Sequence, residues 1–461
     1  MKNLISRSVL ISCVCVLAAL TPSRAQVQLL AVGTLDQSRA GAWQDLSGLR
    51  YPLENGVSAS LLGGFGSGIA WASGNTFVAV PDRGPNAVSY DSFIDDTVSY
   101  VNRFHTIVMD LSPNNNGIGL PFNLTPILRD TTLLWSGSAL TYGSGAGLGV
   151  GSGAPPINNV LQHFFTGRSD NFDAALNSGN SADARLDSEG IRVSNDRRSV
   201  FISDEYGPYI YQFDRLTGKR TRSFQLPSYF YVTNLSPVGS TETSGNTVGR
   251  TANKGMEGLA ITPDGSTLVG IMQNSLIQDN NEGATKLLHI VTVDIASGVT
   301  HEYAYLLTTG SGVSEITALN NHEFIVDERD GHGRGDGSNA VVKQFFKIDL
   351  AGAVDISGMD GLTAETYAVA KTIFVDFVAL LTANGYDPGN IPAKVEGLAF
   401  GPDVDGPTGT LHTLWVANDN DFLQNVADEN GNQIANPNQF FVVGFTDADL
   451  NGSAYVPQKF R

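Results

Sequence analysis

The sequence predicts an all-β fold, a single β-propeller, and three observations point to it. Short runs of β-branched and aromatic residues recur along the chain, separated by turn residues that include many of its 51 glycines. One strand-turn-strand pattern returns several times, and its glutamates, Glu189, Glu257, Glu315 and Glu396, stand 58 to 81 residues apart. Helical periodicity is confined to residues 364–383. Repeats of this length built from strands are typical of propeller blades rather than of a sandwich.

The clearest copy of the pattern is a β-hairpin. Two short apolar runs, Ile191–Val193 and Val200–Ile202, are joined by a polar turn at Asn195-Asp196. A hairpin brings the start of its first strand beside the end of its second. Glu189 is therefore expected to meet the Asp204-Glu205 pair, so that three carboxylates share one end of the sheet.

Four further copies follow the same plan, with a strand-start residue, a turn and a polar end group. Their start and end residues are Glu257 with Gln273-Asn274, Glu315 with Asp327–Asp330, Glu396 with Asn418–Asp421, and, most weakly, Gly66–Ile69 with Asp82–Gly84. Because each copy has the geometry of a hairpin, we expect all the end groups to gather on one rim of the ring.

Six blades are expected over residues 26–461, with seven as the alternative. The five copies account for five, and the 122-residue gap from Ser67 to Glu189 is too long for one blade. Residues 118–140 and 163–165 are strand candidates within this gap, so a sixth blade is expected there. The last blade shows only three strands, and the alternating run Val27–Leu35 is expected to supply the fourth by pairing with Gln439–Phe445.

The first 25 residues are expected to be a signal peptide. Lys2 and Arg7 precede an apolar run from Val9 to Leu20, and small residues follow. A weaker alternative is a lipoprotein leader, since residues 10–13 loosely resemble a lipobox. Both cysteines of the chain lie in this segment, so neither disulfides nor thiol chemistry is expected beyond it. We therefore expect a secreted or periplasmic protein without a membrane segment after cleavage.

The chain is strongly acidic, with a net charge of −18 that becomes −21 when Lys2, Arg7 and Arg24 leave with the signal peptide. Such a charge argues against a nucleic acid partner. The simpler interpretation of the charge is solubility, and the sharper one is that clustered carboxylates bind a divalent cation. We expect a monomer that acts on a small molecule.

The rim of the ring is predicted to be a metal site, because so many carboxylates cannot all ionise at close range without cations. Hard oxygen ligands in a flexible setting favour Ca²⁺. The candidate ligands are Glu189, Asp204, Glu205, Glu257, Glu315, Asp327, Glu328, Glu396 and Asp419. The candidate anion-binding residues are Arg83, Lys254, Arg329 and Lys394. The alternative is that each strand-start Glu accepts backbone N–H bonds from the next blade; Glu205 and Glu328, in loops, are then the purer ligands.

Several of these segments together resemble a known family. They are Gly64-Phe65-Gly66-Ser67-Gly68, Asp187–Ile191, Ser203–Pro208, Asn253–Leu259 and Lys394–Leu398. They are similar to the phytase-like family described as having esterase-like activity of phytase. The resemblance implies a secreted or periplasmic β-propeller, the hydrolysis of phosphomonoesters or other esters, and a calcium-dependent precedent.

Three classes of function are compatible with the sequence. The first is a metal-dependent hydrolase of phosphate or other small esters at the channel rim. The second is a lactonase-type propeller with one metal in its channel, and the third is a propeller that binds a ligand or partner without catalysis. No Gly-x-Ser-x-Gly nucleophile elbow, His-Glu-x-x-His zinc motif or P-loop is present, which argues against those chemistries.

Overall fold

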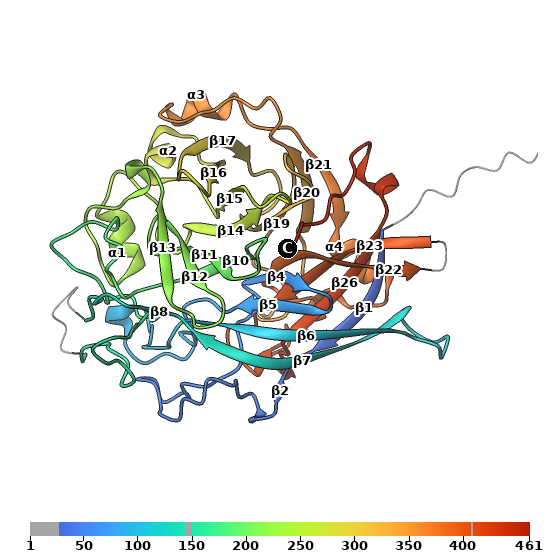
Figure 1. The fold of residues 1–461 in the computed structure, drawn as a ribbon, viewed down its shortest axis with the longest axis horizontal. Helices are drawn as coiled ribbons and strands as arrows, with labels where there is room; N and C mark the ends of the chain where they lie inside the picture. Colours follow the sequence, from blue (N-terminus) through green and yellow to red (C-terminus); the bar gives the residue numbers. More distant parts are fainter. Residues whose placement is uncertain (1–26, 144–149, 407–408) are drawn as a thin grey trace, which may run out of the picture.

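The computed structural model describes residues 27–143, 150–406 and 409–461, and in these residues five four-stranded antiparallel sheets surround a central axis (Figure 1). In chain order the blades are β4 (Gly68–Ser73), β5 (Thr76–Val80), β6 (Arg103–Pro113) and β7 (Phe122–Leu133); β10 (Ser188–Val193), β11 (Ser199–Asp204), β12 (Tyr209–Asp214) and β13 (Arg220–Gln225); β14 (Met256–Ile261), β15 (Thr267–Met272), β16 (Leu287–Asp294) and β17 (Thr300–Leu306); β18 (Gly312–Ala318), β19 (Glu323–Arg329), β20 (Lys343–Asp349) and β21 (Lys371–Asp376); and β22 (Val395–Gly406), β23 (Gly409–Asn418), β26 (Gln439–Phe445) and β1 (Gln28–Thr34). The prediction of a β-propeller is confirmed.

The predicted blade number is wrong, because the described residues form five blades and not six or seven. The strand candidate at residues 118–140 is β7, the outer strand of the first blade, which pairs with the long β6. Residues 163–164 form only β9 (His163–Phe164), paired with β8 (Trp135–Ser136). The described parts of the segment between β7 and β10 are mostly loop, and Phe164 packs beside Tyr100 and Leu49 in one apolar cluster. The extra length is loop that has its own small core.

The N-terminal strand closes the ring as expected. β1 pairs antiparallel with β26, with Val32 opposite Phe441 and Thr34 opposite Gln439. Leu30 on β1 is fully buried and packs in the cluster that also contains Trp415 of β23. The last blade therefore combines three strands from the C-terminal part of the chain with one from the start, and β1 covers the edge that β26 would otherwise expose.

The periodic stretch at 364–383 is not one helix. Helix α3 (Gly361–Glu365) and helix α4 (Phe377–Ala383) flank β21, which pairs with β20 and completes the fourth blade. Asp376 ends the strand and caps α4 by accepting a hydrogen bond from the Ala379 N–H. The other α-helices described are α1 (Gly239–Ser244) and α2 (Ile277–Glu282), and short strands form two further hairpins, β2 (Gln37–Ser38) with β3 (Gly41–Ala42) and β24 (Asn425–Ala427) with β25 (Gln433–Ala435). Among the described helices, none is long and apolar enough to cross a membrane.

The five inner strands, β4, β10, β14, β18 and β22, line the axis, and a buried arginine ties them together. The Arg192 guanidinium donates to the carbonyl oxygens of Ile69, Ile316 and Leu398, each on a different inner strand, at 2.7, 2.8 and 3.2 Å. It also lies 3.1 Å from the Glu315 carboxylate. The Arg192 side chain therefore links β10 to three of the other four inner strands.

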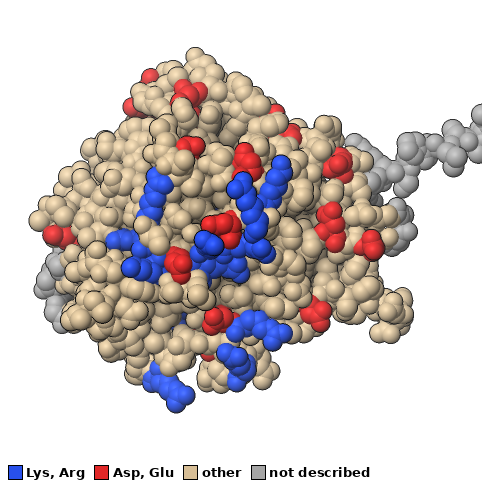
Figure 2. Space-filling view, in the orientation of Figure 1, with Lys and Arg blue, Asp and Glu red and all other residues tan. Residues whose placement is uncertain are grey.

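The C-terminal segment runs across the end of the ring that carries the hairpin turns. Lys459 and Arg461 donate backbone N–H bonds to Pro263 and Asn195, which belong to the turns of two blades. Figure 1 marks the C-terminus close to the centre of the ring, and Figure 2 shows Lys and Arg side chains gathered around the centre of the same face. The acidic end groups of the hairpins lie at the opposite end of the blades.

Candidate metal and anion site at the channel mouth

The strand register defines which residues face the channel mouth at the end-group side. Four of the five blades carry a β-bulge at the start of the inner strand, and in three of them the bulge contains a glutamate without a register partner, Glu189, Glu257 or Glu396. The glycine after each of these glutamates lets neighbouring inner strands approach closely; a Cβ on Gly190 would lie 2.6 Å from the Leu259 Cβ. These contacts explain why Glu is followed by Gly at the start of these strands: the Glu faces the mouth, and the Gly permits close contact with the next inner strand.

A residue at the end of the second strand, or one or two positions beyond it, faces the same mouth. By the same register these positions are held by Asp82, Glu205, Gln273, Arg329 and Asp419. Two residues before each bulge, on the same side of the chain, the second and fifth blades add Asp187 and Lys394. The mouth is therefore acidic on the second and third blades and mixed in charge on the fourth and fifth.

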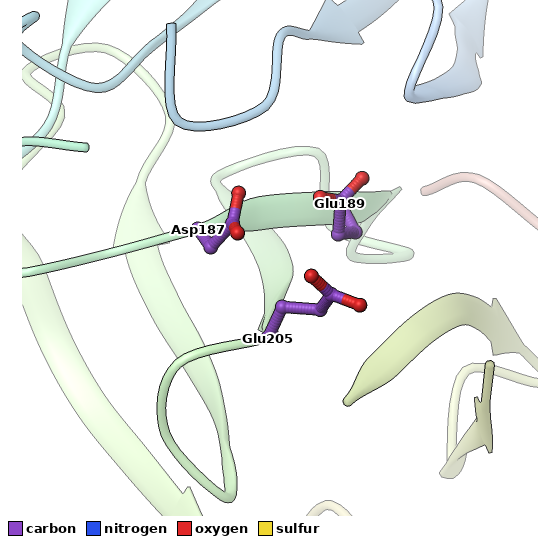
Figure 3. Close-up of side chains that lie close together, drawn as sticks. All are labelled: Asp187, Glu189 and Glu205. Carbon is purple, nitrogen blue, oxygen red and sulfur yellow. The ribbon is translucent and has the colours of Figure 1, made fainter. Parts of the chain in front are cut away.

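The acidic half contains a compact carboxylate cluster. One oxygen each of Asp187, Glu189 and Glu205 lies within 4.8 Å of the other two, and all three residues are buried. Figure 3 shows their side chains extending from the start of β10 and from the end of β11 toward a common space. The structure thus brings Glu189 and Glu205 together, as the hairpin geometry predicts, and adds Asp187.

Several oxygens of this cluster have no partner in the part of the chain that the structure describes. The Glu189 carboxylate makes no hydrogen bond although its residue is only 6% exposed, and the neighbouring Glu257 leaves its buried Oε2 without a donor. Glu205 accepts one bond, from the Gly255 N–H at 2.9 Å. Buried carboxylate oxygens without donors cost free energy, and the one ion pair of the cluster within the described residues, between Arg83 and Asp187, leaves Glu189 without a donor.

The electrostatics of the cluster agree with this deficit. Burial and, after it, the Asp187 carboxylate raise the pKa of Glu205 to about 7, although Arg83 opposes the rise. Burial and the adjacent carboxylates also hold the pKa values of Glu189 and Glu257 well above their ordinary range. Bound protons can relieve the repulsion, and a divalent cation with hard oxygen ligands would replace them. The donor set fits Ca²⁺.

The mixed half of the mouth is already neutralised by internal ion pairs. Arg329 lies 2.5 Å from Glu396, and Lys394 pairs with Asp419 and, at 2.9 Å, with Asp421. Burial alone would lower the pKa of Lys394, but these carboxylates hold it well above its ordinary value. Arg329 and Lys394 thus lie at the mouth, where carboxylates of the chain pair with both of their charges.

Asp82 completes this side of the mouth. Its residue is 5% exposed, and its Oδ1 accepts a bond from the Gly84 N–H at 2.9 Å. Burial raises the pKa of Asp82 to about 7, against the opposing effect of Lys394 and Arg83. Asp82 therefore lies between the acidic cluster and the lysine of the fifth blade.

The other two predicted anion-binding residues, Arg83 and Lys254, differ in their surroundings. Arg83 lies 2.8 Å from Asp187 and donates to the Asn253 side chain, so it stands directly against the carboxylate cluster. Lys254 is half-buried at the loop before β14, and its ammonium forms no ion pair with a described residue.

Glu315 does not face the mouth, because the bulge in its strand β18 lies one residue before the glutamate and not at it. The bulge in β18 leaves Ser314 at the position that Glu189 holds in β10, and Glu315 pairs in register with Asp327. Glu315 accepts the Leu259 and Ile316 N–H groups at 2.9 and 3.0 Å and pairs with Arg192. This residue is an interblade clasp, the alternative weighed for the strand-start glutamates.

Asp204 and Glu328 are also held by backbone. Asp204 accepts the N–H groups of Asp187 and Tyr206, which fixes the turn after β11. Glu328 accepts the N–H groups of Thr308, Thr309 and Gly310 at 2.6 to 2.8 Å. The expectation that a glutamate at this strand end has little backbone within reach is therefore wrong for Glu328.

Asp327 is buried in a different place from the cluster. It is fully buried on β19, and neither carboxylate oxygen has a hydrogen-bond partner among the described residues. Burial raises its pKa well above the ordinary value, although Arg329 and Lys343 oppose this. Asp327 is not part of the carboxylate cluster of Asp187, Glu189 and Glu205.

Three comparisons with known proteins bear on the fold. A family model described as Phytase-like, esterase-like activity of phytase, matches residues 60–422. An uncharacterized secreted protein of Arthroderma benhamiae is 31% identical over 182 residues, which cover 32% of this chain and 35% of that protein. The chain thus matches about a third of the length of this curated relative.

Solved structures with a similar course of the chain are more distant. A putative 6-phosphogluconolactonase from Bacteroides uniformis is 13% identical, with 82% of this chain and 88% of that chain covered and a TM-score of 0.30. An aldose sugar dehydrogenase from Streptomyces coelicolor, in its PQQ-bound form, is 12% identical, with 92% and 99% covered and a TM-score of 0.34. Likenesses at this level carry no argument about activity.

Proposed function

Since the chain belongs to the phytase-like family, described as esterase-like activity of phytase, we propose that it is a secreted, calcium-dependent hydrolase of small phosphate or other esters. The observation that carries the proposal is the buried cluster of Asp187, Glu189 and Glu205, in which Arg83 pairs with Asp187 while the Glu189 carboxylate has no hydrogen-bond partner within the described chain. Glu257 stands beside it as a fourth carboxylate. A relative named as secreted supports the location.

The chain's own residues would divide the work at the mouth. Asp187, Glu189, Glu205 and Glu257 would hold the cation, which when bound would supply a Lewis acid for the phosphoryl or carbonyl oxygen of an ester. Arg83, fixed by Asp187 and Asn253, would bind an anionic oxygen of the substrate beside the cation. Lys254, which forms no ion pair with a described residue, would add a positive charge at the same rim.

Calcium binding tests the proposal directly. Titration calorimetry should show Ca²⁺ binding to the parent protein, and a hundredfold excess over the dissociation constant should add about 2.7 kcal/mol to the free energy of unfolding. Glu189→Gln should weaken the binding yet leave the metal-free melting temperature unchanged or higher, because it removes a ligand and a repulsive charge together. Glu328→Gln is the matched control, because Glu328 is bonded away from the cluster, and it should bind Ca²⁺ like the parent.

An activity screen tests the hydrolase itself. Aryl phosphates, aryl esters and lactones should be offered to the protein with Ca²⁺ and with a chelator. Hydrolysis of one class that needs Ca²⁺ and is lost in Glu189→Gln is the expected result. Calcium binding without any hydrolysis would leave a metal-binding propeller, and no calcium binding at all would contradict the proposed site.

A further inference from the structure

A second concave site lies beside the carboxylate cluster. It is a pocket of about 280 Å³ between the rim loops of the first three blades, and α1 forms one of its walls. Three guanidinium groups line it, from Arg83, Arg185 and Arg250, together with the Tyr206 side chain. The acidic residues of the lining are Asp95 and Glu242, so positive groups outnumber negative ones.

The guanidinium groups are held in place before any ligand arrives. Glu242 accepts bonds from Arg185 at 3.0 Å and from Arg250 at 2.5 Å, so one carboxylate positions two cations. These two arginines hold the pKa of Glu242 below its ordinary value despite its burial. Arg250 is 2% exposed, and its Nη1 has no acceptor in the described residues. A set of fixed guanidinium groups, one of which has an N–H group without an acceptor among the described residues, suits an oxyanion.

The pocket and the carboxylate cluster share a wall. Arg83 lines the pocket and lies 2.8 Å from Asp187 of the cluster. Tyr206, which also lines the pocket, follows Glu205 in the chain. A small molecule at the mouth can therefore reach both places at once.

We propose that this pocket binds a second, non-reacting anionic group of the substrate. The inference rests on the proposed function and makes it narrower: the substrate is a small ester that carries an additional phosphate or carboxylate group. The carboxylate cluster and Arg83 take the end of the molecule that reacts, and Arg185 and Arg250, both fixed by Glu242, select the end that does not. Neutral esters lack the group that the arginines recognise.

The test fills the pocket without touching a charge. Ser240 is exposed on α1 and lines the pocket, whereas its neighbour Thr241 is exposed and does not. Inorganic phosphate is titrated into the parent, Ser240→Phe and Thr241→Phe in chelator, where the bare carboxylate cluster repels the anion. The parent and Thr241→Phe should bind phosphate, and Ser240→Phe should bind it at least about tenfold more weakly. Equal binding by all three proteins, equal weakening in both variants, or no binding to the parent would overturn the inference.

Two further readouts separate this inference from the proposed function. Calcium titration should be the same for Ser240→Phe and the parent, because the variant leaves the four carboxylates intact. For a hydrolysed aryl ester, Ser240→Phe should raise KM only if the ester carries a second anionic group. If phosphate binds as expected while the parent ignores Ca²⁺, the pocket stands and the hydrolase proposal falls. If Ca²⁺ binds and esters are cleaved but Ser240→Phe changes neither phosphate binding nor KM, the pocket proposal falls alone.

Discussion

The Glu328 carboxylate is matched by partners on every side. Besides the three N–H groups of residues 308–310, it accepts the Tyr305 hydroxyl at 2.9 Å and lies 2.5 Å from the Lys371 ammonium. Burial on its own would raise the pKa of Glu328, but Lys371 and the N–H groups of Gly310 and Thr309 outweigh it and lower the pKa to about 2. The ionised form of Glu328 therefore stabilises the folded protein.

Glu328→Gln should destabilise the protein by about 2–3 kcal/mol at pH 7, because it removes a charge-assisted network. The folded pKa lies below the unfolded value of 4.5, so the parent's advantage is present above pH 4.5 and is lost as the pH falls toward 2. Urea unfolding at pH 7 and pH 3.5 measures this, with Glu189→Gln in metal-free buffer as the control that costs no stability. A gap of the same size at both pH values would contradict the assignment.

At the scale of residues, the sequence predicted the rim but not the role of each acid. Hairpin geometry was enough to bring Glu189 and Glu205 together. Glu315 was misplaced because a bulge shifts its strand by one residue, and a one-residue shift moves a side chain to the other face. Asp187 was missed as a site residue, although it stands two positions before Glu189 and thus on the same side of the chain, which was the available signal.

At the scale of elements, β1 joins the two ends of the chain through ladder bonds and buried side chains. Leu29, Leu30 and Ala31 are all buried, and Leu30 fits over Gly444 of β26, where a Cβ would lie 2.8 Å from a Leu30 methyl carbon. Without this strand the last blade would have three strands and an open β26 edge.

Leu30→Asp should lower the melting temperature sharply, because it buries an unpaired carboxylate at the closure and removes the packing of a buried leucine, at a cost of about 3–5 kcal/mol. Gln28→Asp, at the half-exposed start of the same strand, is the matched control and should melt within a degree or two of the parent. Thermal unfolding followed by circular dichroism compares the two. Equal melting of both variants would show that β1 does not hold the ring closed.

The elements that could be predicted were those with strong local patterns. The repeated hairpins and the closing strand follow from alternation and turn residues, and the structure contains them. The blade number could not be read in the same way, because the strand candidates before β10 form the outer strand β7 of the first blade and the two-residue strand β9, not a blade of their own. The helical period at 364–383 was overridden by pairing of β21 with β20, which a single sequence does not show.

Over the whole molecule, acids away from the mouth are also buried with raised pKa values. Burial raises the pKa of Glu302 on β17 to about 8, and Asp355 adds to the rise. The Glu302 carboxylate faces the His289 Nδ1 at 2.9 Å and accepts the Tyr229 hydroxyl, and Asp279 lies on the other side of the His289 ring. Burial likewise raises the pKa of Glu315 to about 7.

Because of these raised pKa values, the stability of the metal-free protein decreases as the pH rises. Between the unfolded pKa of 4.5 and the folded value of about 8, the folded protein keeps a proton on Glu302 that the unfolded chain has released. Stability therefore decreases as the pH rises through this window, by up to about 1.4 kcal/mol per pH unit for each such proton. Glu315 adds to the decrease up to about pH 7.

Glu302→Gln should reduce this slope, because glutamine keeps the size of the side chain and can keep its neutral hydrogen bonds but has no proton to lose. Relative to the parent, the variant should gain stability between pH 6 and pH 8 in chelator. Urea unfolding at the two pH values measures the gain, and Glu429→Gln, at an exposed position between β24 and β25, should follow the parent. If the difference between Glu302→Gln and the parent is the same at pH 6 and pH 8, then Glu302 is already ionised in the folded protein, and the decrease in stability must come from other acids.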